Sequence, residues 1–316
     1  MKILTPVDRL DEVAPLIEAG ADELYGGFVP PGWRDDFRLV GSLNKRTFAE
    51  AQFTSVDELA RAVKLTRSRG KRFYLTLNND FYSAAQTPAV LAEVERAIDL
   101  GVDALIVADL GLVLEIKQRG HKIPLHLSIL AACLNRHAAL FWHELGISRI
   151  VLDRTLTAAE IAGIVTSLPD VDFETFLMYG KCPNVEGLCS FFHHNDPNHI
   201  WPCGQTCELT PVPADSREAE AAVKAQATWA DTVRGNACGL CAYYDLEKAG
   251  LAAVKIAGRG RKTDHKLAAV RAIAKMREMS LSGAGRADIR EAGARMHQEL
   301  FNLPCDPYGC YYPAEE

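Results

Sequence analysis

The chain has 316 residues, a formal net charge of −6, 48% apolar residues and 24% charged residues. This composition is typical of a globular protein with a substantial core, and it gives no general footprint for nucleic acid, although a local basic patch is compatible with it. No apolar run approaches the roughly 20 residues of a membrane helix, and the first residues do not form a secretory signal. We therefore expect a cytoplasmic protein without membrane insertion.

Short apolar or β-branched runs alternate with amphipathic helical stretches along the chain, which is the pattern of parallel βα units. Strands are predicted at 2–7, 21–27, 71–78, 102–109, 123–129, 148–153, 171–179 and 251–258. Seven of them precede a recognisable helix, and a cysteine-rich segment separates the seventh from the eighth. The helix after the second strand begins with capping-box spacing at Ser55 and Glu58.

Eight consecutive βα units close most economically into a (β/α)₈ barrel of the TIM type. The structural alternative is an open doubly wound sheet, but the first strand lacks a following GxGxxG motif, which weakens a dinucleotide-binding interpretation. We predict a barrel over residues 1–280, with a cysteine-rich insertion at 180–245 between strands seven and eight. Residues 281–316 are predicted to form a C-terminal extension of helix and loop.

In such a barrel, chemistry belongs at the carboxyl ends of the strands and in the loops that follow them. The residues predicted at this end are mostly polar: Thr5, Gly26, Gly27, Asn78, Asp109, Ser128, Arg154, Lys181 and Arg259. The cysteine-rich insertion follows strand seven and is therefore expected beside them.

Six of the nine cysteines form three pairs in the insertion. The pairs are Cys182-x6-Cys189, Cys203-x3-Cys207 and Cys238-x2-Cys241. Thiolates ligate soft metals, so zinc and an iron–sulfur cluster are both predicted by this spacing, with incidental buried thiols as the remaining alternative. Cys305 and Cys310 are candidates for a second metal site, whereas Cys133 is expected in the core.

Several sequence motifs occur in this chain in the same order as in a known protein family. They are "CPNVEGLC" (family form C-x4-G-x-C), "WPCGQTC" (RGxCxxxC) and "AVKIAGRGR" (SxKIEGRxR), supported by "NKRTF", "HLSILAACLN" and "IVLDRTLT". With them the sequence resembles the collagenase-like peptidase family U32. That family includes oxygen-independent ubiquinone hydroxylation proteins and bacterial tRNA and rRNA hydroxylation proteins.

The resemblance implies a barrel that carries one [4Fe–4S] cluster. By position, Cys182, Cys189 and Cys203 match three ligands, and Cys238 or Cys241 lies where one branch of the family has the fourth. Another branch uses both cysteines of the CxxxC motif, which keeps Cys207 as a candidate.

Further positions match polar residues of the family: Arg46, Ser128, Asn135, Arg154, Glu174, Lys255 and Arg259. Two positions depart from it, because Ala257 replaces the glutamate of KIEGR and Trp201-Pro202 replaces an arginine-glycine pair. These departures bear on the identity of the substrate more than on the presence of the cluster.

The function implied is an oxygen-independent, iron–sulfur-dependent hydroxylase or related oxidoreductase that acts on an aromatic small molecule or an RNA nucleobase. In relatives the oxygen donor is linked to prephenate. Four cations are expected to bind carboxylate or phosphate groups, namely Arg46, Arg154, Lys181 and Arg259, with Ser128 beside them as a further catalytic candidate. Two alternatives stay open: a U32-type peptidase or other hydrolase, and a non-catalytic, cluster-bearing partner of a second, similar barrel.

Overall fold

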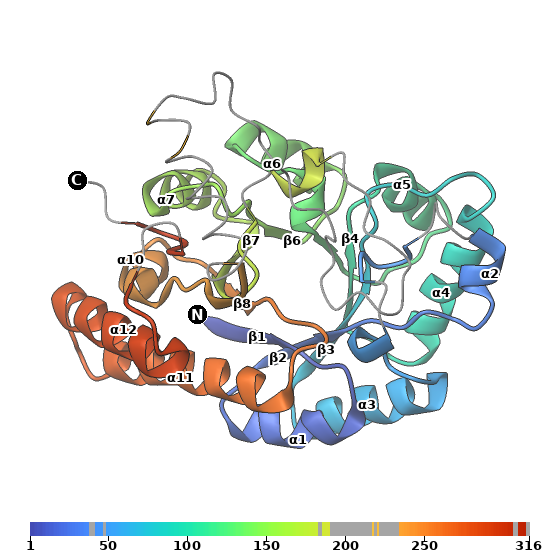
Figure 1. The fold of residues 1–316 in the computed structure, drawn as a ribbon. Helices are drawn as coiled ribbons and strands as arrows, with labels where there is room; N and C mark the ends of the chain where they lie inside the picture. The colour runs from blue at the N-terminus through green and yellow to red at the C-terminus, as the bar shows by residue number, and fades with distance from the viewer. Residues whose placement is uncertain are drawn as a thin grey trace.

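Eight parallel strands form a closed barrel in chain order, surrounded by helices (Figure 1). The structure is a computed structural model and describes residues 1–37, 42–46, 49–182, 185–189, 217, 220, 234–305 and 309–313. The strands are β1 (Lys2–Pro6), β2 (Glu23–Gly26), β3 (Arg72–Leu77), β4 (Ala104–Val107), β5 (Leu125–Leu127), β6 (Arg149–Val151), β7 (Asp172–Met178) and β8 (Ala253–Ile256). The predicted TIM-type barrel is therefore confirmed.

The barrel closes where the first and last strands pair. Lys2 lies opposite Ala253 and Leu4 opposite Lys255, in parallel register. An open doubly wound sheet would leave these two strands at separate edges, so that alternative is wrong. Most residues between β7 and β8 lie outside the described residues, and the predicted insertion at 180–245 stays a prediction.

Helices cover the outside of the barrel. They are α1 (Leu10–Glu18), α2 (Trp33–Phe37), α3 (Val56–Ser68), α4 (Thr87–Asp99), α5 (Leu110–Gln118), α6 (Arg136–Glu144), α7 (Ala158–Ser167), α9 (Arg234–Asn236), α10 (Tyr243–Lys248), α11 (Thr263–Leu281) and α12 (Arg286–Phe301). Short 3₁₀ turns lie at η2 (Ala49–Ala51), η3 (Ile129–Ala131), η4 (Glu186–Leu188) and η6 (Leu240–Ala242). None of the helices in the described part of the chain combines the length and the apolar composition that crossing a membrane requires.

Local sequence signals explain where helices begin and end. At the start of α3, the Ser55 side chain accepts a hydrogen bond from the Glu58 backbone N–H at 3.1 Å, as the capping spacing predicts. The Glu58 carboxylate, however, accepts from the Thr54 N–H at 3.0 Å, so the reciprocal bond of a capping box is displaced by one residue. After the helix, Gly70 adopts a φ of 68°, a left-handed conformation that favours glycine.

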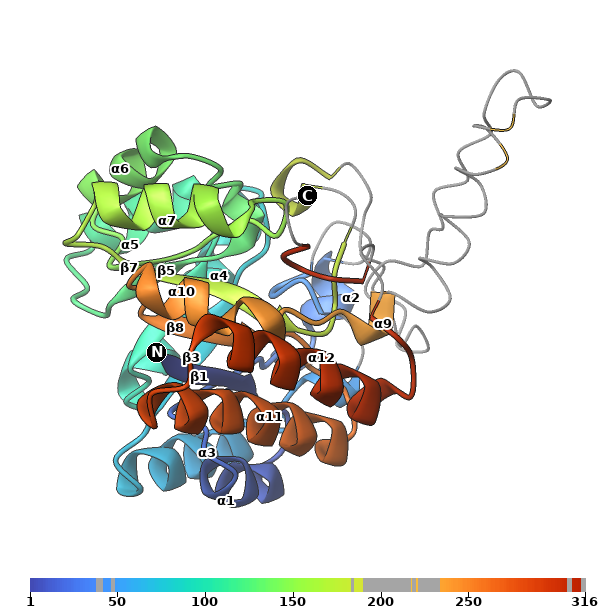
Figure 2. The ribbon, with the colours of Figure 1, turned by 90° about the vertical axis from the view of Figure 1, so that its left-hand side faces the viewer.

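The final helix returns toward the carboxyl ends of the strands. α11 follows β8 along the outside of the barrel, and α12 packs beside it in the opposite direction (Figure 2). Residues 309–313 then lie beside the end of β7, because the Tyr312 hydroxyl donates to the Phe176 carbonyl at 2.8 Å. The end of the described chain is thus near the strand ends that were predicted to carry the chemistry.

The inside of the barrel contains a buried ion network as well as apolar side chains. Arg149 on β6 contacts Glu23 on β2 through two hydrogen bonds of 2.5 and 3.2 Å. It also lies 3.6 Å from the Glu174 carboxylate on β7, which accepts a 2.8 Å bond from Lys255 on β8. Two cations thus face two carboxylates, and the four side chains tie four strands together across the barrel.

Candidate active site

The predicted strand-end residues gather at one end of the barrel, here called the mouth. Asn78 and Ser128 directly follow β3 and β5, and Arg154 and Arg259 each lie three residues beyond β6 and β8. Arg46 reaches the mouth from the loop after β2. The Tyr25 hydroxyl, which donates to the Ile256 carbonyl at 2.8 Å, is an electrostatic neighbour of all three arginines.

Arg259 joins the mouth to the loop after β2. Its guanidinium donates to the Thr76 hydroxyl at 2.8 Å and to the Asn44 carbonyl. Burial, and then the neighbouring charge of Arg46, lower the pKa of Arg259 to about 9. The group remains protonated at neutral pH, so the side chain provides a buried positive charge.

The absence of a side chain at Gly27 makes room for the side chains of Arg259, Asn44 and Gln52. A Cβ atom at position 27 would lie 2.1 Å from the Arg259 guanidinium, 2.6 Å from the Asn44 amide and 2.7 Å from the Gln52 amide. The Asn44 and Gln52 side chains bond each other through both their amide ends, at 2.8 and 3.0 Å. Gln52 also donates to the Arg46 carbonyl at 2.7 Å and so fixes the backbone that carries Arg46.

Arg46 is a cation that has no contacting counter-ion in the described part of the chain. Among the described residues, its guanidinium makes no hydrogen bond or ion pair, although the side chain is only partly exposed. Burial lowers the pKa of Arg46, and the charge of Arg154 lowers it further against the opposing effects of Tyr25 and Glu186. A cation that is largely screened from water and makes no direct ion pair within the described residues favours binding of an anion.

Arg154 ties together the two short segments that carry the first predicted cluster ligands. Its guanidinium donates to the Gly180 carbonyl, stacks 3.9 Å from the centre of the Phe176 ring and lies 3.2 Å from Glu186. That last contact is an ion pair whose atoms are not aligned as a hydrogen bond. Cys182 is two residues beyond Gly180, and Cys189 directly follows the turn that contains Glu186.

Carboxylates act on the three guanidinium groups of the mouth from two sides. Among the described residues, Glu186 acts on Arg154 and Arg46, and Asp8 acts on Arg46 and Arg259. Burial alone would lower the pKa of Arg154, but the Glu186 carboxylate holds it above its ordinary value. For Glu186 burial dominates and raises the pKa, even against Arg154 and Arg46.

The glycine of the CPNVEGLC motif has a packing role. A Cβ atom at Gly187 would lie 2.4 Å from the Leu130 carbonyl oxygen and 2.8 Å from the Ala132 nitrogen. Only glycine therefore lets η4 dock directly on η3, the turn that follows β5. This contact places the segment before Cys189 against the rim of the barrel.

Ser128 and two other predicted mouth residues have structural contacts. The Ser128 hydroxyl accepts from the Asn78 amide at 3.1 Å and from the Leu130 N–H at 3.4 Å. Asp109 caps α5 through the Leu112 N–H at 3.0 Å, and Lys181 donates to the Cys310 carbonyl. These contacts support the loops of the mouth, and the catalytic role expected for Ser128 stays a prediction.

The structure describes part of the predicted ligand set. Cys182 lies at the mouth, where its charge acts on Arg154 and on Tyr311. A thiolate ligand at this position fits a cationic rim. Cys203 and Cys207 lie outside the described residues, and Cys238 lies beside the end of β7, paired with Met178.

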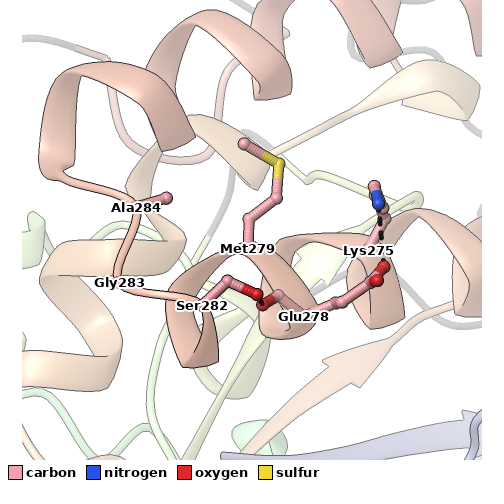
Figure 3. A pocket seen from close by; sticks show the side chains of 6 residues that line it. All are labelled: Lys275, Glu278, Met279, Ser282, Gly283 and Ala284. Carbon is pink, nitrogen blue, oxygen red and sulfur yellow. Dashed lines mark hydrogen bonds and ion pairs between the residues drawn. The ribbon is translucent and has the colours of Figure 1, made fainter.

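A shallow hollow is present at a different place. Lys275, Glu278, Met279, Ser282, Gly283 and Ala284 line it, at the end of α11 (Figure 3). Because a helix after a barrel strand runs antiparallel to that strand, this end of α11 lies at the amino-end face, opposite the mouth. The Lys275 and Glu278 side chains pair with each other at 2.8 Å, so the hollow lacks the features of the mouth.

Several site residues were not found from the sequence. Asn44, Gln52 and Glu186 lie in loops with no periodic pattern, and Tyr311 follows the last helix. Arg149 and Glu23 were missed as well, although a charged residue at an inward strand position is a signal that could have indicated the buried network.

The fold and the site define a (β/α)₈ barrel protein with a cationic, thiol-bearing mouth. The sequence profile of peptidase family U32 matches residues 8–314, and the chain therefore belongs to peptidase family U32.

Two curated proteins are similar to part of the chain. The chain is 27% identical to tRNA hydroxylation protein P of Escherichia coli over 200 residues, which cover 62% of this chain and 41% of that protein. It is 24% identical to a collagenase of Porphyromonas gingivalis over 218 residues, which cover 65% of this chain and 49% of that protein. The chain thus spans less than half the length of these relatives. A solved U32 peptidase matches 59% of this chain and 73% of its own with 17% identity and a TM-score of 0.44.

Proposed function

We propose that the chain is an iron–sulfur-dependent, oxygen-independent hydroxylase that acts on an aromatic ring or a nucleobase. Membership of family U32 supports this, as does the similarity to a tRNA hydroxylation protein. The Cys182 thiol beside the arginines of the mouth supports a redox centre near the substrate rather than elsewhere on the barrel.

The Arg46 guanidinium, which contacts no carboxylate among the described residues, is the observation that carries the proposal. Charge-assisted hydrogen bonds from arginine to a carboxylate or phosphate are among the strongest in proteins. Arg46 would bind the anionic group of an oxygen donor such as prephenate, or a phosphate of an RNA substrate. Arg259 and Arg154 would add positive charge from both sides, while their existing bonds hold the loops in place.

The cluster in this proposal is a [4Fe–4S] centre held by Cys182, Cys189, Cys203 and a fourth thiolate from Cys207, Cys238 or Cys241. When bound, it would supply one-electron chemistry and an iron that accepts an oxygen donor. Arg154 would position it, because this side chain bonds the Gly180 carbonyl just before Cys182 and pairs with the Glu186 side chain between Cys182 and Cys189.

A hydrolase is less well supported, despite the collagenase among the relatives. A serine nucleophile requires a base within hydrogen-bond reach. The neighbours of the Ser128 hydroxyl in the described structure are an amide and a backbone N–H, neither of which accepts its proton.

Anaerobic purification followed by an absorption spectrum and by iron and sulfide analysis tests the cluster. Cys182→Ala and Cys189→Ala should each lose most of the iron, because each removes a thiolate that the remaining ligands do not replace. Cys133→Ala is the matched control, since that thiol is buried in the core and should leave the iron content unchanged. Wild-type protein without iron and sulfide would overturn the proposal.

The substrate is tested separately in a deletion strain. Profiling of modified nucleosides and of aromatic metabolites should reveal one hydroxylated product that disappears and returns with the wild-type gene but not with Cys182→Ala. A complete profile in the deletion strain would contradict a hydroxylase function, including one exerted through a partner of the same family.

A further inference from the structure

Two buried carboxylates at the mouth each carry an oxygen that no donor in the described part of the chain reaches. Asp8 lies two residues beyond β1, and Asp153 lies two residues beyond β6. Asp8 Oδ1 and Asp153 Oδ2, here called the spare oxygens, are withdrawn from solvent and accept no hydrogen bond from the described residues. A buried acceptor without a donor costs free energy, so its retention indicates a partner that binds there.

The alternation of side chains along each strand directs both residues into the barrel. They lie four positions beyond Leu4 and Arg149. Leu4 packs with Tyr25 inside the barrel, and Arg149 belongs to the buried ion network. Since every second residue of an extended strand lies on the same face, Asp8 and Asp153 continue these inward rows to the mouth.

The surroundings of Asp8 engage its Oδ2 atom. This oxygen accepts from the Gly260 N–H at 2.6 Å and from the Lys266 ammonium. Lys266 also donates to Glu12 at 2.7 Å, so one cation serves two buried carboxylates. Burial raises the pKa of Asp8 even against Lys266, which is the direction expected of a carboxylate that lacks a further donor. Gly260 directly follows Arg259, so the Asp8 carboxylate lies beside the cations of the mouth.

Asp153 is likewise engaged through one oxygen. Its Oδ1 accepts from the Thr155 N–H at 2.9 Å and from the Thr155 hydroxyl at 2.8 Å. Asp153 directly precedes Arg154, which places its carboxylate beside another cation of the mouth. Asp8 and Asp153 are each 1% exposed, so bulk water does not supply the missing donors.

Asp109, another carboxylate at this end of the barrel, provides a contrast. Both of its oxygens accept from backbone N–H groups, one from Leu112 at 3.0 Å and the other from Tyr82 at 2.5 Å. A carboxylate that only holds loops and helix ends is thus saturated by the chain itself, whereas Asp8 and Asp153 each keep one acceptor for another partner.

We propose that Asp8 and Asp153 determine specificity by accepting hydrogen bonds from hydroxyl or N–H groups of the ligand whose acid group binds Arg46. Ionised carboxylates only accept hydrogen bonds, and guanidinium groups only donate them. The mouth is therefore complementary to an anion that also carries donors. An acid without donors would leave the spare oxygens buried and unpaired, and sites of this kind discriminate strongly against such a ligand.

This inference rests on the anion site of the proposed function, because the same ligand contacts Arg46. It does not involve the cluster or the redox step. Iron and sulfide analysis can therefore fail while the preference for donor-bearing acids is found, and the reverse result is equally distinct.

Matched pairs of aromatic acids test the spare oxygens. The pairs are benzoate and 4-hydroxybenzoate, cinnamate and 4-hydroxycinnamate, and phenylpyruvate and 4-hydroxyphenylpyruvate. The members of a pair differ by one hydroxyl, and the pairs differ in the spacing between hydroxyl and carboxylate. In calorimetric titrations of wild-type protein, the hydroxylated member of at least one pair should bind at least about 10-fold tighter than its partner.

Two isosteric substitutions assign the preference to the aspartates. In Asp153→Asn the Thr155 donors hold the amide oxygen, so the amide nitrogen takes the place of the spare oxygen. In Asp8→Asn the Gly260 N–H and the Lys266 ammonium impose the same orientation, and Lys266 keeps its bond to Glu12. Each change replaces an acceptor by a donor at nearly constant volume, so the preference should disappear in at least one of the two variants.

Asp109→Asn is the matched control and should keep the preference, because both Asp109 oxygens already have donors. Preference retained in both Asp8→Asn and Asp153→Asn, or lost equally in the control, would overturn the inference. If the variants fail to fold, the wild-type comparison still decides. Equal affinities within all three pairs, or no binding of any of the six acids, would also overturn it.

Discussion

Replacement of Arg46 by alanine separates substrate binding from folding more cleanly than any other change at the mouth. The Arg46 guanidinium has no contacting partner among the described residues, whereas Arg154 and Arg259 each bond a backbone carbonyl. Its loop is held through the Arg46 carbonyl and the Gln52 amide, which the substitution leaves in place. Loss of the side chain also removes repulsion from Arg154. We therefore expect Arg46→Ala to fold with unchanged or slightly higher stability.

The expected effect on anion binding follows from the chemistry of the contact. A hydrogen bond to a charged group contributes about 1.5–3 kcal/mol, and about 1.4 kcal/mol corresponds to a tenfold change in Kd. Arg46→Ala should therefore weaken binding of a carboxylate ligand such as prephenate by roughly 10- to 100-fold. Arg46→Lys should recover part of the loss, since it restores the charge but not the planar, two-pronged geometry.

Calorimetric titration of prephenate, with thermal unfolding of the same samples, provides the assay. Arg119→Ala is a suitable control, because Arg119 is an exposed arginine on the outside of the barrel with a 3.7 Å ion pair to Glu115. Unchanged binding in Arg46→Ala would refute the anion site. A large loss of stability would refute the view that the guanidinium lacks a partner.

Three further predictions concern the barrel itself. Gly27→Ala should lower the free energy of unfolding by about 1–3 kcal/mol, because the added Cβ atom would make the contacts of 2.1–2.7 Å described above. Gly163→Ala, at an exposed helical position with nothing nearby, should raise the free energy of unfolding by about 0.5–1 kcal/mol. Denaturant titration that gives the same stability for both variants would contradict the packing argument. Arg149→Met should cost about 3–5 kcal/mol in the same measurement, because it removes the buried cation that bonds both oxygens of the Glu23 carboxylate and leaves, among the described residues, only the exposed Lys2 as its ion pair. A cost below about 1 kcal/mol would show that the network is dispensable. Burial, and then the charge of Arg149, hold the pKa of His126 well below its ordinary value, so only the unfolded chain takes up a proton on this imidazole as the pH falls below about 6.5. The free energy of unfolding should therefore drop by up to about 1.4 kcal/mol per pH unit there, and His126→Gln should lose this pH-dependent component. If the imidazole is protonated in the folded state, the substitution should leave the pH profile of stability unchanged.

The barrel was predictable because its signal is local and repeated. Each βα unit has its own apolar run and its own amphipathic helix, and eight such units have one economical closure. Strand ends were less accurate: the run at 21–27 contains a strand only from Glu23 to Gly26. Flanking residues are apolar because they are buried, even where their backbone leaves the sheet.

The mouth was predictable only in part. Arg154 and Arg259 were predicted as site residues because each directly follows a predicted strand, at the end of the barrel where chemistry is expected. Their partners were not, since Arg259 meets Asn44 across 215 residues of sequence and no spacing rule connects them. Arg46 was placed by resemblance, and the absence of a contacting counter-ion among the described residues is visible only in the three-dimensional structure.

The three mouth arginines come from segments near the beginning, the middle and the end of the barrel, so their meeting has a thermodynamic consequence. A partly folded chain brings no such set of cations together, and an anion that binds there selects the closed barrel over every open form. By linkage, a ligand at 100 times its Kd would add about 2.7 kcal/mol to the stability of the whole domain. The same occupied site would cancel the repulsion that closure creates, which makes the substrate itself a contributor to the integrity of the fold.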